Sequence, residues 1–216
     1  MIRLEISQEI IGLARNGETL KKIGRTGWAL AGVDSVRQES VGEHSYGTIL
    51  VSLLISKALL HQGEQVDLSK VITLAALHDL PESMTSDIPR LAVDLGGHLL
   101  QEGKKEAEKN AFQLISKKSE FFGEWLLNLW QEMEVKSSTE VRIVRGADII
   151  DMLVHAVSLE NSGVSPKILN QFFISSHTSL NELEIGLVED IFWDLYKEHI
   201  DNANSLGIKL EQITRS

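Results

Sequence analysis

A histidine and two carboxylic acids stand close together in the segment LAALHDLPE, which runs from Leu74 to Glu82. His78 and Asp79 come directly after an apolar run, and Pro81 removes a backbone amide that a continuing helix would need. The pair is therefore expected at a helix end, where adjacent side chains about 100° apart can reach one ion from a short arc. A capping histidine beside a solvated aspartate is the alternative interpretation of the pair alone.

Two further segments carry groups that could join this pair in a metal site. Asp148 lies among apolar residues in the segment 142–160, where an ionised carboxylate is costly unless it is paired or bound to a metal ion. An ion pair with Arg145, one helical turn earlier, is the alternative. His44 begins a second aliphatic segment, where its imidazole could cap a helix or coordinate an ion. Asp151 is expected to be a solvated or outer acid rather than a ligand.

The composition limits which ligands a metal site can use. The sequence has no cysteine, seven histidines and 31 acidic residues, so any metal must be held by imidazole and carboxylate groups. A formal net charge of −10 repels polyanions, and duplex nucleic acid is therefore not an expected partner. A small anion that binds through a metal ion remains compatible with this charge.

The elements that position these groups are expected to be helices. The chain has only three prolines, and apolar residues recur at spacings of three and four, which is the helical period. The motif SVGE, from Ser40 to Glu43, fits a capping box and places His44 in the first turn of a helix. The sequence therefore predicts an all-α fold, with helices over roughly 4–15, 41–61, 68–80, 101–117, 120–133, 138–161, 165–174 and 180–205.

The length of 216 residues, with 43% hydrophobic and 24% charged residues, is typical of one compact domain with a substantial core. The turn-rich segments 61–67 and 160–166 are too short to act as linkers between domains. No window is long and apolar enough for a membrane span, and the start MIRLEISQEI lacks a signal-peptide pattern. We therefore expect a single domain over 1–216, located in the cytoplasm and without a membrane partner.

Five short motifs of chemically distinctive residues follow one another along the chain. They are RTGW (25–28), ESVGEHSY (39–46), HDLPE (78–82), SDIPR (86–90) and GADIIDML (146–153). In this order they resemble the motifs of HD-domain hydrolases, and within these the 5′-deoxynucleotidase family that includes human HD domain-containing protein 2. The resemblance covers about residues 20–162, and the helical extension over 165–216 is only loosely similar.

The resemblance implies one divalent metal ion held by two imidazoles and two carboxylates. The first histidine of the family corresponds to His44, its His-Asp pair to His78 and Asp79, and its distant aspartate to Asp148. This ligand set suits Mn²⁺, Co²⁺, Fe²⁺, Mg²⁺ or Zn²⁺, and the ligand types alone do not choose among them.

The resemblance also implies roles for residues outside the ligand set. Glu82 is implied to orient or deprotonate the attacking water, and Asp87 to contact the sugar or assist proton transfer. Arg25 is implied to bind phosphate and Trp28 to pack against or gate the nucleoside, whereas without the resemblance we expect a surface cation and a core aromatic. Ser86 stands where the family commonly has glycine, so a positive φ there would strain the loop that carries Asp87.

These interpretations lead to one expected function. Hydrolysis of a phosphomonoester needs neutralisation of phosphoryl charge, an activated water and management of protons, which a divalent ion, an arginine and a carboxylate can supply. We expect an HD-domain helical bundle that releases phosphate from deoxyribonucleoside 5′-monophosphates. The alternatives are another HD chemistry, such as a phosphodiesterase or a nucleotide pyrophosphohydrolase, and a non-catalytic helical module that retains a structural metal.

The resemblance further implies a homodimer. Aromatic side chains could line its interface, and burial in the core is the alternative for each of them. The candidates are Trp125, Trp130, Phe172, Phe173 and Trp193.

Overall fold

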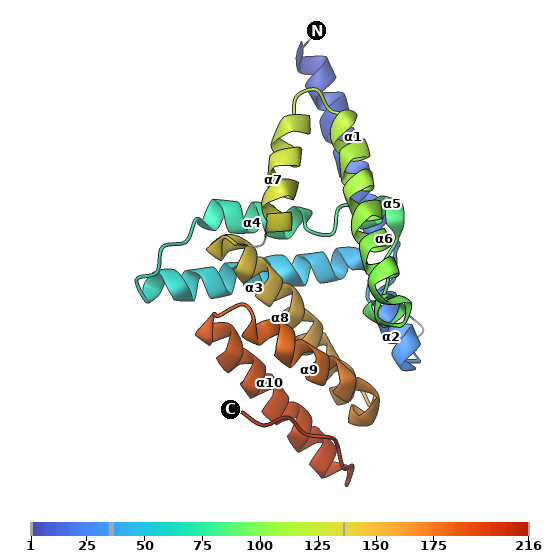
Figure 1. Ribbon diagram of the computed structural model, residues 1–216, viewed down its shortest axis with the longest axis vertical. Helices are drawn as coiled ribbons and strands as arrows, with labels where there is room; N and C mark the ends of the chain where they lie inside the picture. Colours follow the sequence, from blue (N-terminus) through green and yellow to red (C-terminus); the bar gives the residue numbers. More distant parts are fainter. Residues whose placement is uncertain (1, 35–36, 136, 216) are drawn as a thin grey trace. The chain divides into compact units, whose positions relative to one another are not determined.

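The computed structural model describes residues 2–34, 37–135 and 137–215, and the regular structure of these residues is helical. An isolated antiparallel bridge between Gly24 and Ser40 is the one β feature found in the described ranges. The predicted all-α fold class is confirmed. The helices, labelled in Figure 1, are α1 (Ile2–Leu20), α2 (Thr26–Ala31), α3 (Val41–His61), α4 (Leu68–Leu77), α5 (Glu82–Thr85), α6 (Arg90–Lys117), α7 (Gly123–Val135), α8 (Thr139–Asn161), α9 (Pro166–Asn181) and α10 (Gly186–Ser205).

The chain forms two compact units, and α3 contributes to both. The first unit contains Met1–Leu30, Asp34–Tyr46 and Ala76–Ser138, and the second contains Ala31–Val33, Gly47–Ala75 and Thr139–Ser216. The predicted single domain over 1–216 stays a prediction. Within the described part of the chain, no helix is long and apolar enough to cross a membrane.

The first unit is built around the second half of α6 and the helix α7. Phe112 and Trp130 stack with their ring centroids 4.9 Å apart, and Leu80 belongs to the same buried cluster. The helix α1 is tied to the turn before α7 through Glu9, whose carboxylate accepts hydrogen bonds from the amides of Glu120 and Phe121, each at 3.1 Å. The residue that follows the His-Asp pair is therefore anchored in the core of this unit.

The second unit contains α8, α9 and α10, which pack against one another (Figure 1). Gly146 on α8 permits a close approach, since a Cβ atom there would lie 3.1 Å from Cγ1 of Val188 on α10. The segment after α10 folds back along the unit, where the Ile213 amide donates to the Tyr196 hydroxyl at 2.9 Å. This unit presents Asp148 and Asp151, which both lie on α8.

Several helix boundaries differ from those predicted. The helix α6 begins at Arg90 and not at 101, with a non-helical glycine at Gly97 (φ 59°, ψ −154°) inside it. The helices α2 and α5 were not predicted, because six and four residues are too few to show a helical period. The helix α10 begins at Gly186 and not at 180, because Glu184 adopts a positive φ of 52° that interrupts the helical path.

Candidate active site

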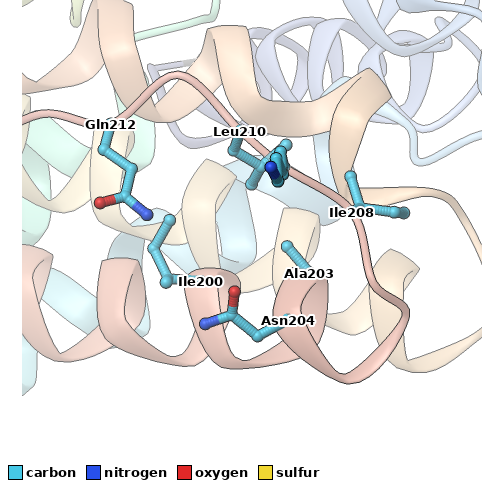
Figure 2. A pocket seen from close by; sticks show the side chains of 7 residues that line it. Ile200, Ala203, Asn204, Ile208, Leu210 and Gln212 are labelled. Atoms are coloured by element: carbon cyan, nitrogen blue, oxygen red, sulfur yellow. The ribbon is translucent and has the colours of Figure 1, made fainter.

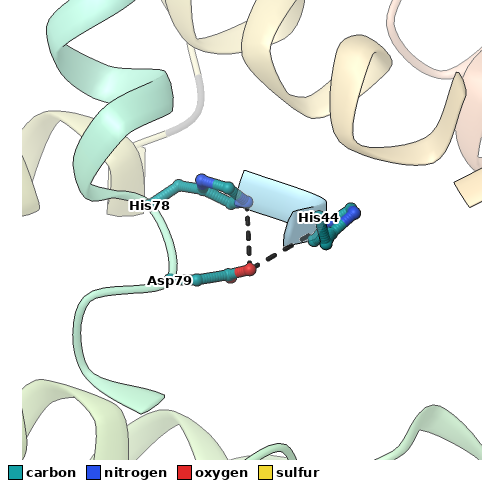
Figure 3. A group of neighbouring side chains, drawn as sticks. All are labelled: His44, His78 and Asp79. Carbon is teal, nitrogen blue, oxygen red and sulfur yellow. Dashed lines mark ion pairs between the residues drawn. The ribbon is translucent and has the colours of Figure 1, made fainter. Parts of the chain in front are cut away.

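Three of the predicted metal ligands lie together in the first unit. One ligand atom from each of His44, His78 and Asp79 can be chosen so that all lie within 4.8 Å of one another. Oδ2 of Asp79 is 3.2 Å from Nε2 of His78 and 3.9 Å from Nε2 of His44. Figure 3 marks these two ion pairs with dashed lines. The two imidazole rings meet edge to face with centroids 5.8 Å apart. The helix α4 ends at Leu77, which confirms that His78 and Asp79 lie at a helix end.

His44 is positioned by the capping box predicted from SVGE. The Glu43 amide donates to Oγ of Ser40 at 3.1 Å, and the Ser40 amide donates to Oε2 of Glu43 at 2.9 Å. The next amide, that of Val41, donates to the carbonyl oxygen of Ile23 at 2.8 Å and joins the helix start to the segment before α2. His44 therefore lies in the first turn of α3, fully buried, and the carboxylate of Glu43 is used by the cap.

The surroundings of Asp79 fit a divalent ion. Its Oδ2 atom is buried and accepts no hydrogen bond from any residue that the structure describes. Burial alone would raise the pKa of Asp79, but the imidazoles of His78 and His44 and the guanidinium of Arg25 hold that pKa well below its usual range. Two imidazoles that face one buried carboxylate oxygen provide the nitrogen and oxygen ligands that divalent transition metals bind.

Glu82 begins α5 and lies directly beside this cluster. Its amide donates to the carbonyl oxygen of Asp79 at 3.0 Å, and the residue is only 6% exposed. Its buried Oε2 atom has no hydrogen-bond partner within the described ranges. Burial and the negative charges of Asp79 and Asp87 raise the pKa of Glu82 to about 8. A carboxyl group with a pKa near neutrality can both take up and release a proton at working pH.

The segment RTGW places Arg25 and Trp28 in the first unit as well. Nη1 of Arg25 is 3.9 Å from Oδ2 of Asp79, and both side chains are largely buried. The Arg25 amide donates to the Glu39 carbonyl oxygen at 2.8 Å, which fixes this segment to the start of α3. Trp28 is 3% exposed and its indole nitrogen donates to Oε2 of Glu39 at 2.9 Å. Its proposed contact with the nucleoside stays a prediction.

Asp87 is engaged with the start of α2. Its Oδ2 accepts a hydrogen bond from the Thr26 amide at 2.5 Å. The preceding residue, Ser86, has φ 64° and ψ 171°, a conformation that is nearly restricted to glycine. The strain expected from serine at this position is therefore present in the backbone, immediately before Asp87.

Asp148 and Asp151 belong to the second unit, so the first unit by itself does not contain the predicted fourth ligand. The assignment of Asp148 as a ligand stays a prediction. Asp151 lies against the backbone of α3, because a Cβ atom added to Gly47 would overlap its carboxylate. Asp151 is thus fixed by a close approach of two helices, and only glycine at position 47 leaves room for it.

A cavity of about 240 Å³ occurs in the second unit (Figure 2). It lies between α10 and the segment that follows it, and none of the predicted site residues lines it. Its lining residues are Ile200, Ala203, Asn204, Ile208, Lys209, Leu210 and Gln212.

Sequence reasoning did not single out two residues that hold the loop of Asp87. The backbone amide of Thr26 donates to the carboxylate of Asp87, and almost any residue type could supply such an amide. Lys104 donates to the neighbouring Ile88 carbonyl oxygen from the charge-rich middle of α6, where one lysine among several gives no distinguishing pattern. Neither contact could be found without the arrangement of the helices.

A family model described as an HD domain matches residues 17–185. The chain belongs to the HD-domain family. It is 31% identical over 144 residues to a protein of Dictyostelium discoideum named 5′-deoxynucleotidase HDDC2, covering 65% of this chain and 72% of the relative. The human protein of the same name is 29% identical over 166 residues, covering 77% and 76%. A conserved hypothetical protein from Pyrococcus furiosus has a similar structure, with a TM-score of 0.71, 30% identity and coverage of 87% and 99%.

Proposed function

We propose that this protein is a metal-dependent 5′-deoxynucleotidase, which hydrolyses deoxyribonucleoside 5′-monophosphates to a deoxynucleoside and phosphate. Membership of the HD-domain family and the names of the relatives support the reaction class. The observation that carries the proposal is the cluster around Asp79, where two imidazoles and Arg25 face one buried carboxylate and Glu82 follows directly.

The residues proposed to hold the ion are His44, His78 and Asp79 from the first unit and Asp148 from α8. The assignment of Asp148 rests on the likeness of GADIIDML to the motif of the family. When bound, a divalent ion would neutralise phosphoryl charge and lower the pKa of a water molecule. Imidazole and carboxylate ligands suit Mn²⁺, Co²⁺, Fe²⁺, Mg²⁺ or Zn²⁺.

The other side chains would bind the substrate and manage its protons. The planar guanidinium of Arg25 can donate two parallel hydrogen bonds to a phosphate. Glu82 would take a proton from the attacking water and return it to the leaving 5′ oxygen, and its raised pKa suits both steps. We further propose that Asp87 contacts the sugar or assists this transfer and that Trp28 shapes the nucleoside pocket.

A screen of metals against substrates tests the reaction. Purified protein stripped of metal should release inorganic phosphate from dAMP, dTMP or dCMP only after a divalent ion is restored. Preferential cleavage of a phosphodiester or of dATP would identify another HD chemistry. A protein that binds metal but cleaves none of these compounds would be a binding module.

We also propose that the protein is cytoplasmic and forms a homodimer through exposed aromatic residues. Trp130 and Phe173 are buried within their own units and are not available for such contacts. Trp125 on α7 is 47% exposed, with Phe121 also exposed nearby in the chain. Light scattering of the wild-type protein and of Trp125→Ser should show a dimer that is weakened by the substitution. The net charge of −10 continues to disfavour duplex nucleic acid.

A further inference from the structure

Lys104, in the middle of α6, contacts the loop that carries Asp87. Its Nζ donates a hydrogen bond to the Ile88 carbonyl oxygen at 3.1 Å. The same atom lies 3.5 Å from Oε1 of Glu108, one helical turn further along α6. The Lys104 side chain is only 28% exposed. Ordering a long lysine side chain costs entropy, and here two oxygen acceptors offset that cost and keep the amino group on the loop.

The loop depends on contacts from outside because its own backbone is strained. The φ and ψ angles of Ser86 are energetically unfavourable for a residue with a side chain. Such a conformation persists only where surrounding contacts enforce it. Two residues supply such restraints. Thr26 holds Asp87 through its amide, which donates to the carboxylate, and through its hydroxyl, which donates to the carbonyl oxygen, and Lys104 holds the carbonyl group of Ile88.

The positive charge of Lys104 also acts on two acidic side chains, Glu82 and Glu108. The pKa of Glu82 is raised by burial and by Asp79 and Asp87, and Lys104 opposes this increase. Burial raises the pKa of Glu108, and the negative charge of Asp79 raises it further, whereas Lys104 lowers it. The hydrogen bond to Ile88 and the ion pair with Glu108 place the Lys104 side chain on the side of α6 that faces the loop of Asp87.

We propose that Lys104 is a positioning residue of the active site, which holds Asp87 in place through the Ile88 carbonyl, while Glu108 holds Lys104. The inference rests on the proposed function. Because Thr26 directly follows Arg25, a shift of Asp87 would also shift the proposed phosphate-binding side chain. Loss of Lys104 should therefore weaken substrate binding more than it slows turnover.

Kinetics of Lys104→Met, Lys104→Arg and the control Lys105→Met test this proposal. Lys105 is the next residue on α6, but it pairs with Glu134 at 3.6 Å. For dAMP hydrolysis, Lys104→Met should lose about 10- to 100-fold in kcat/KM, mainly through KM. Lys104→Arg should recover most of this loss because a guanidinium can still donate to the carbonyl oxygen. Lys105→Met should behave like the wild type.

Combining Lys104→Met with Asp87→Asn separates a positioning role from a general loss of stability. If Lys104 acts through Asp87, the double variant should lose little more than the worse single variant. Fully additive losses in folded protein would overturn the proposal. So would equal kinetics for Lys104→Met and Lys105→Met.

Hydrogen exchange provides a measurement that does not require the proposed reaction. Peptides covering Ser86–Arg90 should exchange faster in Lys104→Met than in Lys105→Met, whether or not a substrate is known. If the wild-type protein is inactive but Ser86–Arg90 still exchanges faster in Lys104→Met, the nucleotidase function is refuted and the contact between Lys104 and the loop is supported. An active wild-type protein without the difference would refute the role of Lys104 and leave the function standing.

Discussion

Glu82 combines three features in one side chain: burial, a position just after the His-Asp pair, and a pKa raised to about 8. We predict that Glu82→Gln keeps the shape of the site but removes its proton acceptor. The variant should retain metal and bind a nucleoside monophosphate, yet lose on the order of 10²- to 10⁴-fold in kcat, the usual range for a general acid-base group. Metal analysis, substrate titration and turnover measured on the same preparation check this separation.

Glu124→Gln is the matched control for this substitution, because Glu124 is exposed in the first turn of α7. It should leave kcat, metal content and stability unchanged. If Glu82→Gln turned over substrate at nearly the wild-type rate while folded and loaded with metal, Glu82 would be a structural residue of the turn after Pro81.

Ser86 provides a second prediction, which concerns backbone strain. Its positive φ and extended ψ cost about 1–3 kcal/mol for a residue with a side chain, whereas glycine adopts them freely. Glycine adds back a cost of about 0.5–1 kcal/mol through the entropy of the unfolded chain. Ser86→Gly should therefore raise the free energy of unfolding by on the order of 1 kcal/mol, measured by urea denaturation.

The control for Ser86 is Ser162, which follows α8, is exposed and has no positive φ. Ser162→Gly has no strain to relieve, so it should be neutral or slightly destabilising. A loss of stability in Ser86→Gly equal to that in Ser162→Gly would show that the loop is not strained in solution.

At this scale, local patterns predicted part of the candidate site. The break at Pro81 and the capping box at Ser40 are short-range features, and they correctly gave the helix positions of His78, Asp79 and His44. The hydrogen bond from Thr26 to Asp87 spans 61 positions in the chain and leaves no pattern in either segment. Contacts of this kind depend on the packing of helices, which the sequence does not show directly.

At the scale of elements, strongly periodic segments were predicted well. The helices α3 and α8 span nearly the expected residues. The helix α8 buries a long, mainly apolar stripe that repeats with the helical period, and the start of α3 is set by the capping box at Ser40. The first half of α6 was missed because Leu95 and Leu99 are exposed and glycines interrupt the pattern. A helix without a buried face has no periodicity to detect.

Glu9 joins two elements of the first unit and predicts a dependence of stability on pH. The Ser119 hydroxyl and the amides of Glu120 and Phe121 donate to its carboxylate, and these hydrogen bonds lower the pKa of Glu9. Because the pKa is lower in the folded state than the ordinary 4.5, the unfolded state binds more protons near that pH. The contribution to stability is therefore complete above the ordinary pKa and is lost as pH falls through the lowered one.

Glu9→Gln should consequently be less stable than the wild type at pH 7, and the difference should shrink as the pH falls below about 4.5. Thermal unfolding at a series of pH values checks this convergence. The exposed Glu124→Gln variant serves again as the control. A stability difference that stays constant down to pH 3 would mean that Glu9 acts through packing and not through its charge.

On the scale of the whole molecule, the second unit contains a buried polar network that holds its three helices. Nδ1 of His199 on α10 lies 2.5 Å from Oε1 of Glu160 on α8, and Nε2 lies 3.0 Å from Oδ1 of Asn170 on α9. Asn202 donates to the second oxygen of Glu160 at 2.8 Å. Both oxygens of the carboxylate thus face donors, and both ring nitrogens face acceptors.

Glu160→Gln should break this network, because a carboxamide has one acceptor oxygen and would turn its NH₂ group toward His199 or Asn202. A buried polar group that is left without its hydrogen-bond partner costs about 1–3 kcal/mol, so the midpoint of chemical unfolding should fall. The exposed Glu182→Gln should have no such effect. Equal stability of the two variants would show that the network contributes little.

The division into two units was not apparent in the sequence. Composition and length indicate only that the chain can bury a core, and the turn-rich segments 61–67 and 160–166 both lie inside the second unit. Two of the boundaries between the units lie inside helices, one within α3 between Tyr46 and Gly47 and one within α4 between Ala75 and Ala76, where the helical pattern is continuous. A boundary inside a helix leaves no signal in turn residues or linker composition.

Metal binding predicts a change in the stability of the entire chain. An ion that binds only the folded protein stabilises it by mass action, by about 2.7 kcal/mol when the free ion is at 100 times its Kd. Adding a divalent ion to metal-free wild-type protein should therefore raise the Tm, and a chelator should reverse the increase.

His78→Ala should lose both the bound metal and this increase in Tm, because it removes one imidazole from the cluster around Asp79. His61→Ala, at the exposed end of α3, should keep both. Asp148→Ala applies the same test to the proposed fourth ligand. A full metal complement by elemental analysis in His78→Ala would remove His78 from the site, and the same result in Asp148→Ala would restrict the ligand set to the first unit.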